Sequence, residues 1–385
     1  LLADPEKVDA EVKKETQAIK KKHGEDRRTF LGEDLQEFRR EDLEAHEQVV
    51  VTLSQGGYIK RILASTYRKQ HRGGKGVSSM RTRDDDPVRH ILVGDTHDTL
   101  LFFTNTGRVL ALKSFELRAD SSRNTRGVPI VNVIPLTNRE KVNAVVGVNS
   151  LRQESLYLVL ATRRGSIKRV ALESISKIRR AGLIIMNLKG DDELVTARLA
   201  SENDDIMMVT EQGMSIRFPA TAVSARLRAA GGVRGMVLRD KDKIVGMDIV
   251  IPESKLLVIS KKGFGKLTDL KRYRQQGRGG SGIKTLNVTK KTGNVAAAEV
   301  IADSDQVYLV SESAQVLCTS LSEIRNTGRA TQGVTIFKMQ QGDSVASIAC
   351  AKALIELDSD KTAKATSLNG QGGNGSLPAP SSVDK

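Results

Sequence analysis

Residues 49–61 read VVVTLSQGGYIKR, which is a β-branched apolar run, a turn with two glycines and a second apolar run. Two such runs joined by a glycine turn are typical of a β-hairpin, because glycine readily adopts the positive φ that a tight hairpin turn requires. We therefore predict two antiparallel strands that meet at Gly57.

The hairpin pattern recurs along the chain. Its later copies read LLFFTNTGRVL at 100–110, LYLVLATRRGSIKR at 156–169, IMMVTEQGMSIR at 206–217, LLVISKKGFGKL at 256–267 and VYLVSESAQVL at 307–317. The turn positions 57, 107, 165, 213, 263 and 314 are 50, 58, 48, 50 and 51 residues apart, and five of the six hold glycine. Internal repeats of this length indicate a solenoid, a propeller or a similar array.

Each copy has a second half, formed by a basic, glycine-containing loop and a further apolar strand. The loops read RGGKGV at 72–77, RGV at 126–128, RAGL at 180–183, GGVRG at 231–235, RGGSGI at 278–283 and TQGV at 331–334. Roughly four strands in each of six repeats predict an all-β disc of six blades.

The regions on either side of the repeats differ from them in composition. Residues 1–46 predict the end of a helix and a linker, with Asp4 as N-cap, Pro5 in the first turn and Gly24 as a left-handed C-cap. This helix has only a narrow stripe of apolar residues and is expected to pack against a part of the protein absent from this chain. We expect 47–351 to form the disc and 352–385, rich in Gly, Ser and Pro, to be a disordered tail.

The positive charge is concentrated in the repeats. The 385 residues carry a net charge of +15, and residues 49–351 alone carry 47 Lys and Arg against 28 Asp and Glu. A folded region with this excess favours an extended anionic partner, with nucleic acid ahead of a membrane surface. No apolar run approaches the length of a membrane span, and the N-terminus shows no secretory signal. Because the chain lacks an initial Met, we expect a fragment or a processed product.

The cysteines and histidines predict neither a disulfide framework nor a metal centre. Two cysteines, Cys318 and Cys350, cannot form a disulfide framework for a chain of this size. They indicate a reducing, cytoplasmic compartment. The five histidines have no Cys or carboxylate at the spacing of metal ligands, so a zinc site is not expected. No phosphate-binding Gly-x-x-x-x-Gly-Lys-Ser/Thr loop is present, and we expect no catalytic residue in this fragment.

The most specific motif lies in the first repeat and is preceded by Arg68 and Lys69. It consists of Gln70, His71, Arg72, Gly73, Gly74, Lys75 and Gly76. Three glycines allow the backbone to approach another surface, while Arg72 and Lys75 supply charge for phosphates. The motif resembles the signature box of the DNA gyrase A C-terminal domain family, in which the second position is usually Arg rather than His. The resemblance extends over residues 1 to about 351 and includes GEDRRT at 24–29 and GVPIVN at 127–132.

The resemblance implies a six-bladed β-pinwheel that wraps double-stranded DNA around its basic rim. It also implies that the box binds DNA and latches the first blade to the last. The partners would be two gyrase B subunits together with a second gyrase A subunit in a cytoplasmic, nucleoid-associated heterotetramer. That holoenzyme would be a type II topoisomerase that supercoils DNA negatively with ATP and Mg²⁺. The resemblance implies that ATP and Mg²⁺ bind outside this fragment. It also implies that the catalytic tyrosine belongs to a region that this chain omits.

Wrapping requires many phosphate contacts rather than base readout, so we predict a basic rim next to the hairpins and loops. Besides the box, the predicted rim residues are Lys60, Arg61, Arg68, Lys69, Arg108, Arg123, Arg126, Arg163, Arg164, Lys168, Arg169, Lys261, Lys262, Lys266, Lys271, Arg272, Arg274, Arg278 and Lys284. The loop at 276–282 (QGRGGSG) repeats the box with Ser281 in place of Lys, and is either a second DNA-binding loop or a remnant.

Three alternatives remain open from the sequence. The C-terminal domain of the topoisomerase IV counterpart of gyrase A has a related pinwheel, although the intact box favours gyrase. A kelch-like interaction scaffold has a similar repeat length but would carry Trp, which this chain lacks. A membrane-surface adaptor would bind liposomes in a manner that nucleic acid does not compete away.

Overall fold

A computed structural model describes residues 4–25, 40–66, 86, 88–120, 125–302, 306–313 and 315–351. The chain divides into two compact units, Leu1–Leu43 and Glu44–Lys385. Within the described residues, no helix combines the length and the apolar character needed to cross a membrane. The expected tail at 352–385 lies outside the described residues.

The first unit contains the helix α1 (Pro5–His23) and the short helix α2 (Arg40–Leu43). Asp4 caps α1 as predicted, since its side chain accepts a hydrogen bond from the backbone N–H of Glu6 at 3.2 Å. The prediction of a left-handed C-cap is wrong. Gly24 has φ −68° and ψ 125°, an extended conformation, and closes the helix by donating its N–H to Lys20 O at 2.7 Å.

The second unit consists of six small antiparallel sheets, which confirms the predicted six-bladed all-β disc. Blade one contains β3 (Val88–Asp95), β1 (Gln48–Ser54), β2 (Tyr58–Leu63) and β6 (Val128–Pro129); blade two contains β7 (Val142–Val148), β4 (Thr99–Thr104), β5 (Arg108–Lys113) and β10 (Leu183–Ile184); blade three contains β11 (Leu194–Ala200), β8 (Tyr157–Thr162), β9 (Ser166–Ala171) and β14 (Val233–Arg234). Blade four contains β15 (Ile244–Val250), β12 (Asp205–Thr210), β13 (Met214–Pro219) and β18 (Ile283–Lys284); blade five contains β19 (Val295–Ile301), β16 (Lys255–Ser260), β17 (Phe264–Asp269) and β22 (Val334–Thr335); blade six contains β23 (Val345–Ala351), β20 (Gln306–Ser311) and β21 (Val316–Ser320) among the described residues.

The sequence repeats and the blades do not have the same boundaries. The short fourth strand of each of the first five blades comes from the next repeat: β6, for example, follows the hairpin of blade two but pairs with β2 of blade one. The same exchange joins β10 to β5, β14 to β9, β18 to β13 and β22 to β17. Each blade is thus held to its successor by covalent continuity as well as by packing, which defines a β-pinwheel.

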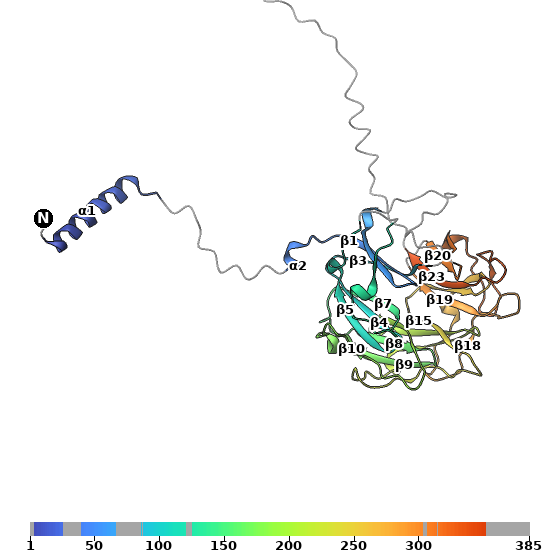
Figure 1. Ribbon diagram of the computed structural model, residues 1–385. Helices are drawn as coiled ribbons and strands as arrows, with labels where there is room; N and C mark the ends of the chain where they lie inside the picture. The colour runs from blue at the N-terminus through green and yellow to red at the C-terminus, as the bar shows by residue number, and fades with distance from the viewer. Residues whose placement is uncertain are drawn as a thin grey trace, which may run out of the picture. The chain divides into compact units, whose positions relative to one another are not determined.

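The long strands β3, β7, β11, β15, β19 and β23 are in contact in that order, and β23 returns to β3. The side chain of Ser347 on β23 donates a hydrogen bond to Val88 O on β3 at 3.3 Å. In Figure 1 the colour passes around the disc from blue through green to orange, so that β1 and β3 come to lie near β20 and β23. The array is therefore a closed ring.

The hydrophobic core is distributed between neighbouring blades. On β4, Leu100 and Phe102 pack toward blade one, whereas Leu101 and Phe103 pack toward blade three. Successive side chains of a strand point to opposite faces, and here both faces are covered. This explains why the strands read as continuous apolar runs rather than as alternating patterns. Similar clusters fill the spaces between the blades up to blade six.

Candidate nucleic-acid interface

The glycines at the hairpin turns have the predicted backbone conformation. Gly57, Gly107, Gly165, Gly213 and Gly263 have φ between +75° and +82°. Ala314, at the sixth turn, lies outside the described residues. After the hairpins of repeats two to six the chain passes through a loop into the fourth strand of the previous blade, and that strand is the outermost in its sheet. The glycine-containing loops of these five repeats therefore lie along the outer edge of the disc, whereas the first loop, at 72–77, lies outside the described residues.

Part of the predicted interface lies outside the described residues. This part comprises the box (Gln70, His71, Arg72, Gly73, Gly74, Lys75 and Gly76) together with Arg68, Lys69 and Arg123. Their roles therefore stay predictions.

Three of the predicted rim lysines are not at the surface, and the prediction of an exposed side chain is wrong for them. Lys60, Lys168 and Lys266 have relative exposures of 1%, 0% and 0%. Lys168 Nζ donates to the carbonyls of Ile185, Arg228 and Ala230 at 2.6, 2.6 and 2.7 Å. Burial lowers the pKa of each of these lysines to about 8. A buried ammonium group needs such acceptors, and here the acceptors belong mainly to the loops between blades.

The other two buried lysines make equivalent contacts. Lys60 Nζ donates to Thr125 O at 3.0 Å, and Lys266 Nζ donates to Gly328 O at 2.6 Å. Strand registers place Leu110 and Ile216 at the corresponding positions of blades two and four. Odd-numbered blades thus clamp the next loop with a lysine, while blades two and four use an apolar side chain. At this position of the second hairpin strand, lysine and an apolar residue therefore alternate from one blade to the next over blades one to five.

Several predicted arginines are also committed to contacts within the protein. Arg61 and Arg169 are buried, and the Arg169 guanidinium lies 4.4 Å from the centroid of the Tyr157 ring. Arg108 is only partly exposed, because its Nη2 lies 2.6 Å from Glu140 Oε2 and also donates to Pro135 O at 2.6 Å. The prediction of a free cation at the rim is wrong for these three arginines.

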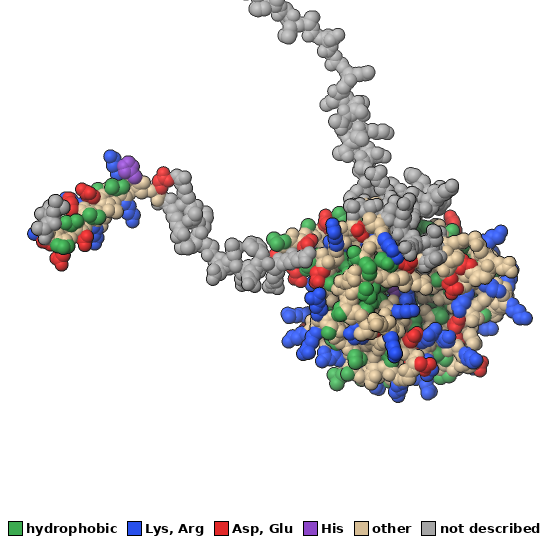
Figure 2. All heavy atoms as spheres, in the orientation of Figure 1, with side chains coloured by type: hydrophobic (Ala, Val, Ile, Leu, Met, Phe, Trp, Pro, Cys, Tyr) green, Lys and Arg blue, Asp and Glu red, His purple; other side chains and the backbone are tan. Residues whose placement is uncertain are grey.

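The remaining predicted cations are at the surface. The exposed members are Arg126, Arg163, Arg164, Lys262, Lys271, Arg272, Arg274, Arg278 and Lys284, and Lys261 is half-exposed. Some are tethered: Arg163 lies 2.9 Å from Glu193, and Arg278 Nε donates to Ala222 O at 2.9 Å. Figure 2 shows Lys and Arg side chains projecting around the outline of the disc in that view.

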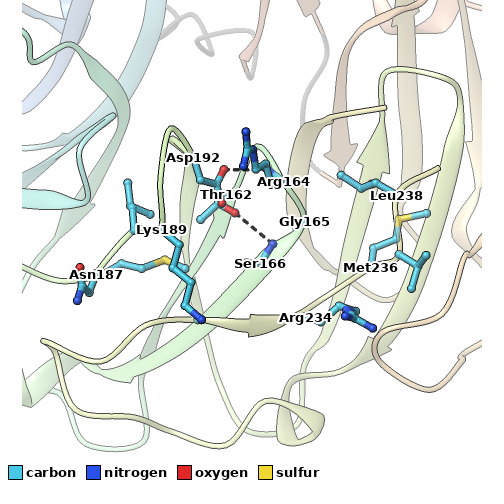
Figure 3. Close-up of a pocket in the computed structure, with 14 residues that line it drawn as sticks. Thr162, Arg164, Gly165, Ser166, Asn187, Lys189, Asp192, Arg234, Met236 and Leu238 are labelled. Atoms are coloured by element: carbon cyan, nitrogen blue, oxygen red, sulfur yellow. Dashed lines mark hydrogen bonds between the residues drawn. The ribbon is translucent and has the colours of Figure 1, made fainter. Parts of the chain in front are cut away.

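A hollow of about 480 Å³ lies beside the blade-three hairpin turn and combines three exposed cations. Arg164, Lys189 and Arg234 come from three different segments that line it (Figure 3). Arg164 also forms an ion pair with Asp191. Asp192 Oδ1 accepts a hydrogen bond from the backbone N–H of Arg164 at 2.9 Å and supports the turn. The arrangement offers several positive groups around one concave surface, which suits a phosphate backbone.

Lys189 and Arg234 were not among the predicted site residues. Arg234 pairs with Ser166, and Lys284 pairs with Met214, so both are the exposed second residue of an outermost strand. The signal was present in the repeats, because aligning GGVRG with GGSGIK places Arg234 and Lys284 near each other. Only the exchanged strand shows that both lie on the outer edge.

The structure also brings together two histidines and an aspartate that the sequence did not suggest as neighbours. His46, Asp95 and His97 each offer a ligand atom, and these atoms lie within 4.8 Å of one another. His46 and His97 are 51 residues apart in the chain, so sequence spacing did not show this group, and the expectation that the chain holds no zinc site stays a prediction.

A closed six-bladed pinwheel with basic outer edges defines the class of this protein as a propeller-like domain suited to a polyanion. The family model for the "DNA gyrase C-terminal domain, beta-propeller" matches residues 48–95, 98–149, 156–201, 204–251, 254–302 and 305–352. The chain therefore belongs to the DNA gyrase A C-terminal domain family. The six matches coincide with the six sequence repeats, each of which contains the three long strands of one blade.

Known relatives agree with this assignment. The DNA gyrase A protein of Staphylococcus epidermidis is 39% identical over 352 residues, which are 91% of this chain and 39% of the relative. Its Staphylococcus aureus counterpart is 38% identical over 376 residues, 97% of this chain and 42% of the relative. The chain spans about two fifths of the length of these relatives.

Two solved structures share the fold. A DNA gyrase A C-terminal domain has a TM-score of 0.68 and 26% identity, and the match covers 79% of this chain and 99% of that domain. The C-terminal domain of DNA topoisomerase IV has a TM-score of 0.67 and 26% identity, and the match covers 85% of this chain and 99% of that domain. The fold alone does not separate the two.

Proposed function

We propose that this chain binds double-stranded DNA without reading its sequence and wraps it around the edge of the disc with a fixed hand. The observation that supports this most directly is the closed ring of blades whose outer edges carry exposed cations such as Arg126, Arg234 and Lys284. Bending a duplex through a large angle costs several kcal/mol, roughly 1–6 for 40–90°. Many phosphate contacts, each releasing counterions, offset that cost.

The wrapping domain would act within a larger type II topoisomerase. In this proposal the gyrase A chain pairs with a second copy and two gyrase B chains in the cytoplasm, associates with the nucleoid, and supercoils DNA negatively. ATP and Mg²⁺ are used by other parts of the assembly, and the 385-residue chain contributes DNA binding rather than cleavage. The relatives named above, both gyrase A proteins, and the intact box at 70–76 favour gyrase over topoisomerase IV. The family match argues against a kelch-like scaffold.

The box would bind DNA and join the first blade to the last. In blades one to five the outermost strand comes from the loop of the following repeat. The box loop is the equivalent segment of the first repeat, and blade six has three strands among the described residues. Whether 276–282 acts as a second DNA-binding loop stays open; Arg278 is exposed but its guanidinium already donates to Ala222 O and Arg234 O.

The proposal is tested by sealing nicked circular DNA in the presence of the 385-residue chain and measuring linking number. The natural chain should impose writhe of one sign, whereas Arg72→Ala combined with Lys75→Ala should bind DNA with only modestly reduced affinity and lose the writhe. Lys13→Ala with Lys14→Ala, which removes the same charge from α1, is the matched control and should behave as the natural chain. Unchanged writhe in the box variant would refute the role of the box, and no writhe with the natural chain would refute wrapping.

A further inference from the structure

Two histidines and one aspartate meet where the chain enters the pinwheel. His46 precedes β1, and Asp95 and His97 flank Thr96 at the turn between β3 and β4. His46 Nδ1 lies 2.9 Å and His97 Nδ1 lies 3.4 Å from Asp95 Oδ1. The two imidazole rings are stacked, with centroids 3.7 Å apart and planes inclined by 21°. Three potential metal ligands thus lie within 4.8 Å of one another.

The backbone around these residues is held in place by Thr96. Its hydroxyl donates to Ala45 O at 2.6 Å and accepts from the Glu47 N–H at 3.2 Å, and its own N–H donates to Glu47 O at 3.0 Å. Both neighbours of His46 are therefore fastened to the residue between Asp95 and His97. These backbone contacts leave the ligand atoms unused, although the Thr96 hydroxyl also lies 3.3 Å from His97 Nδ1 and 3.4 Å from Asp95 Oδ1.

Asp95 Oδ1 is surrounded by more donors than one oxygen accommodates well. It accepts the backbone N–H of His97 at 2.8 Å, and both ring nitrogens approach it as well. A carboxylate oxygen offers about two lone-pair positions. A cation between the nitrogens and the carboxylate satisfies the ring nitrogens without a proton on either.

The two nitrogen–oxygen distances match the ligand spacing of a tetrahedral metal ion, and the stacked rings must turn apart to point both nitrogens at it. With metal–nitrogen and metal–oxygen bonds of about 2.0–2.2 Å, ligand atoms on a tetrahedral ion lie roughly 3.3 Å apart. The measured separations of 2.9 and 3.4 Å are close to that value. Imidazole and carboxylate are ligands for Zn²⁺ and similar transition metals, whereas Mg²⁺ and Ca²⁺ require mostly oxygen ligands. The His46 side chain is 73% exposed, so an ion and a water ligand can reach the site from solvent.

We propose that His46, Asp95 and His97 bind one Zn²⁺ ion. The ion fastens residues 44–47, the beginning of the second unit, to the β3–β4 turn of blade one. It is a structural site that controls how firmly the chain entering the pinwheel is attached to it. The proposal does not depend on DNA binding.

The test is a Zn²⁺ titration of the metal-stripped 385-residue chain against a chromophoric chelator, in buffer with excess Mg²⁺. We expect one Zn²⁺ per chain, and loss of one ligand in His46→Ala or His97→Ala should weaken binding by at least about tenfold. Substituted Co²⁺ should give the visible absorption of a four-coordinate ion. Zn²⁺ should raise the melting temperature of the natural chain but not that of His46→Ala.

Controls separate this site from unspecific binding and from misfolding. His23→Ala removes an imidazole from α1 and should bind Zn²⁺ as the natural chain does. Because the His46 side chain is exposed, its replacement should leave the circular dichroism spectrum unchanged. The proposal is overturned if the natural chain shows no saturable Zn²⁺ binding, or if the folded His46→Ala and His97→Ala variants bind the ion as well as the natural chain. In that case the trio is a hydrogen-bonded contact only.

Discussion

The ammonium group of Lys168 lies 2.7 Å from the carbonyl oxygen of Ala230, 62 residues further along the chain. Lys168 is on the blade-three hairpin, and Ala230 is in the loop of the fourth repeat that leads back to blade three as β14. We predicted from the sequence that this lysine contacts DNA, but in the structure it holds neighbouring repeats together. The buried basic residues of this domain therefore stabilise the fold, and only the exposed ones are available to contact DNA.

Replacing the buried lysine tests its structural task. Lys168→Met should lower the free energy of unfolding by about 2–4 kcal/mol, because three carbonyls lose their donor, one in a buried and two in a partly buried setting. Urea unfolding followed by circular dichroism measures this. Lys189→Met, at an exposed lysine, is the matched control and should change stability by less than about 0.5 kcal/mol. Equal stability of both variants would contradict the clamp.

The exposed cations of the outermost strands should contribute to DNA affinity. Arg234→Ala and Lys284→Ala should each weaken duplex binding uniformly across sequences and reduce the slope of log K against log salt by about 1. Filter binding over a range of salt concentrations measures the slope. Lys13→Ala, in α1, serves as the control with one charge removed elsewhere. If the two rim variants kept the slope of the natural chain, these positions would not contact phosphates.

The turn glycines should be sensitive to a single methyl group. Gly263 has φ +75°, and a Cβ there would collide with the carbonyl oxygen of Phe337. Gly263→Ala should therefore cost at least about 1–2 kcal/mol from the left-handed conformation, plus the displacement of the Phe337 carbonyl. Thermal unfolding checks this. Gly277→Ala, where no atom lies within 4 Å, should melt close to the natural chain; similar melting of both variants would argue against a left-handed residue at Gly263.

A partly buried carboxylate, that of Glu299, should make the stability of the disc depend on pH. Burial, assisted by Asp248 and opposed by Arg198, raises the pKa of Glu299 on β19 from 4.5 to about 7. The folded state then binds more protons than the unfolded state between these values, so stability falls as pH rises from about 4.5 through 7, by at most about 1.4 kcal/mol per pH unit.

Comparison with a neutral variant isolates this effect. Glu299→Gln removes the titrating group, so the difference in unfolding free energy between the natural chain and the variant should change across this pH window and level off above it. Urea titrations at several pH values provide the data. A difference that stays constant from pH 4.5 to 7 would show that Glu299 ionises in the folded protein as it does in the unfolded chain.

The sequence by itself determined the repeat, the β class and the hairpin turns. These are local properties: apolar runs favour strands, and a tight turn between them requires positive φ, which Gly57 and its counterparts adopt. The position of the net charge within 49–351 was equally readable, because it is a matter of composition.

Only the tertiary structure decided which charges are available and which distant residues meet. Lys60 and Lys284 are both lysines in basic stretches, yet one is buried under a loop of the next repeat and the other is exposed on an outermost strand. That difference arises from the exchange of strands between blades, which pairs segments about 70 residues apart. His46 and His97 meet for a similar reason, since β1 and β3 are neighbours in the sheet although a long loop separates them in the chain. Local pattern specifies an element, but burial and proximity depend on how the elements are paired.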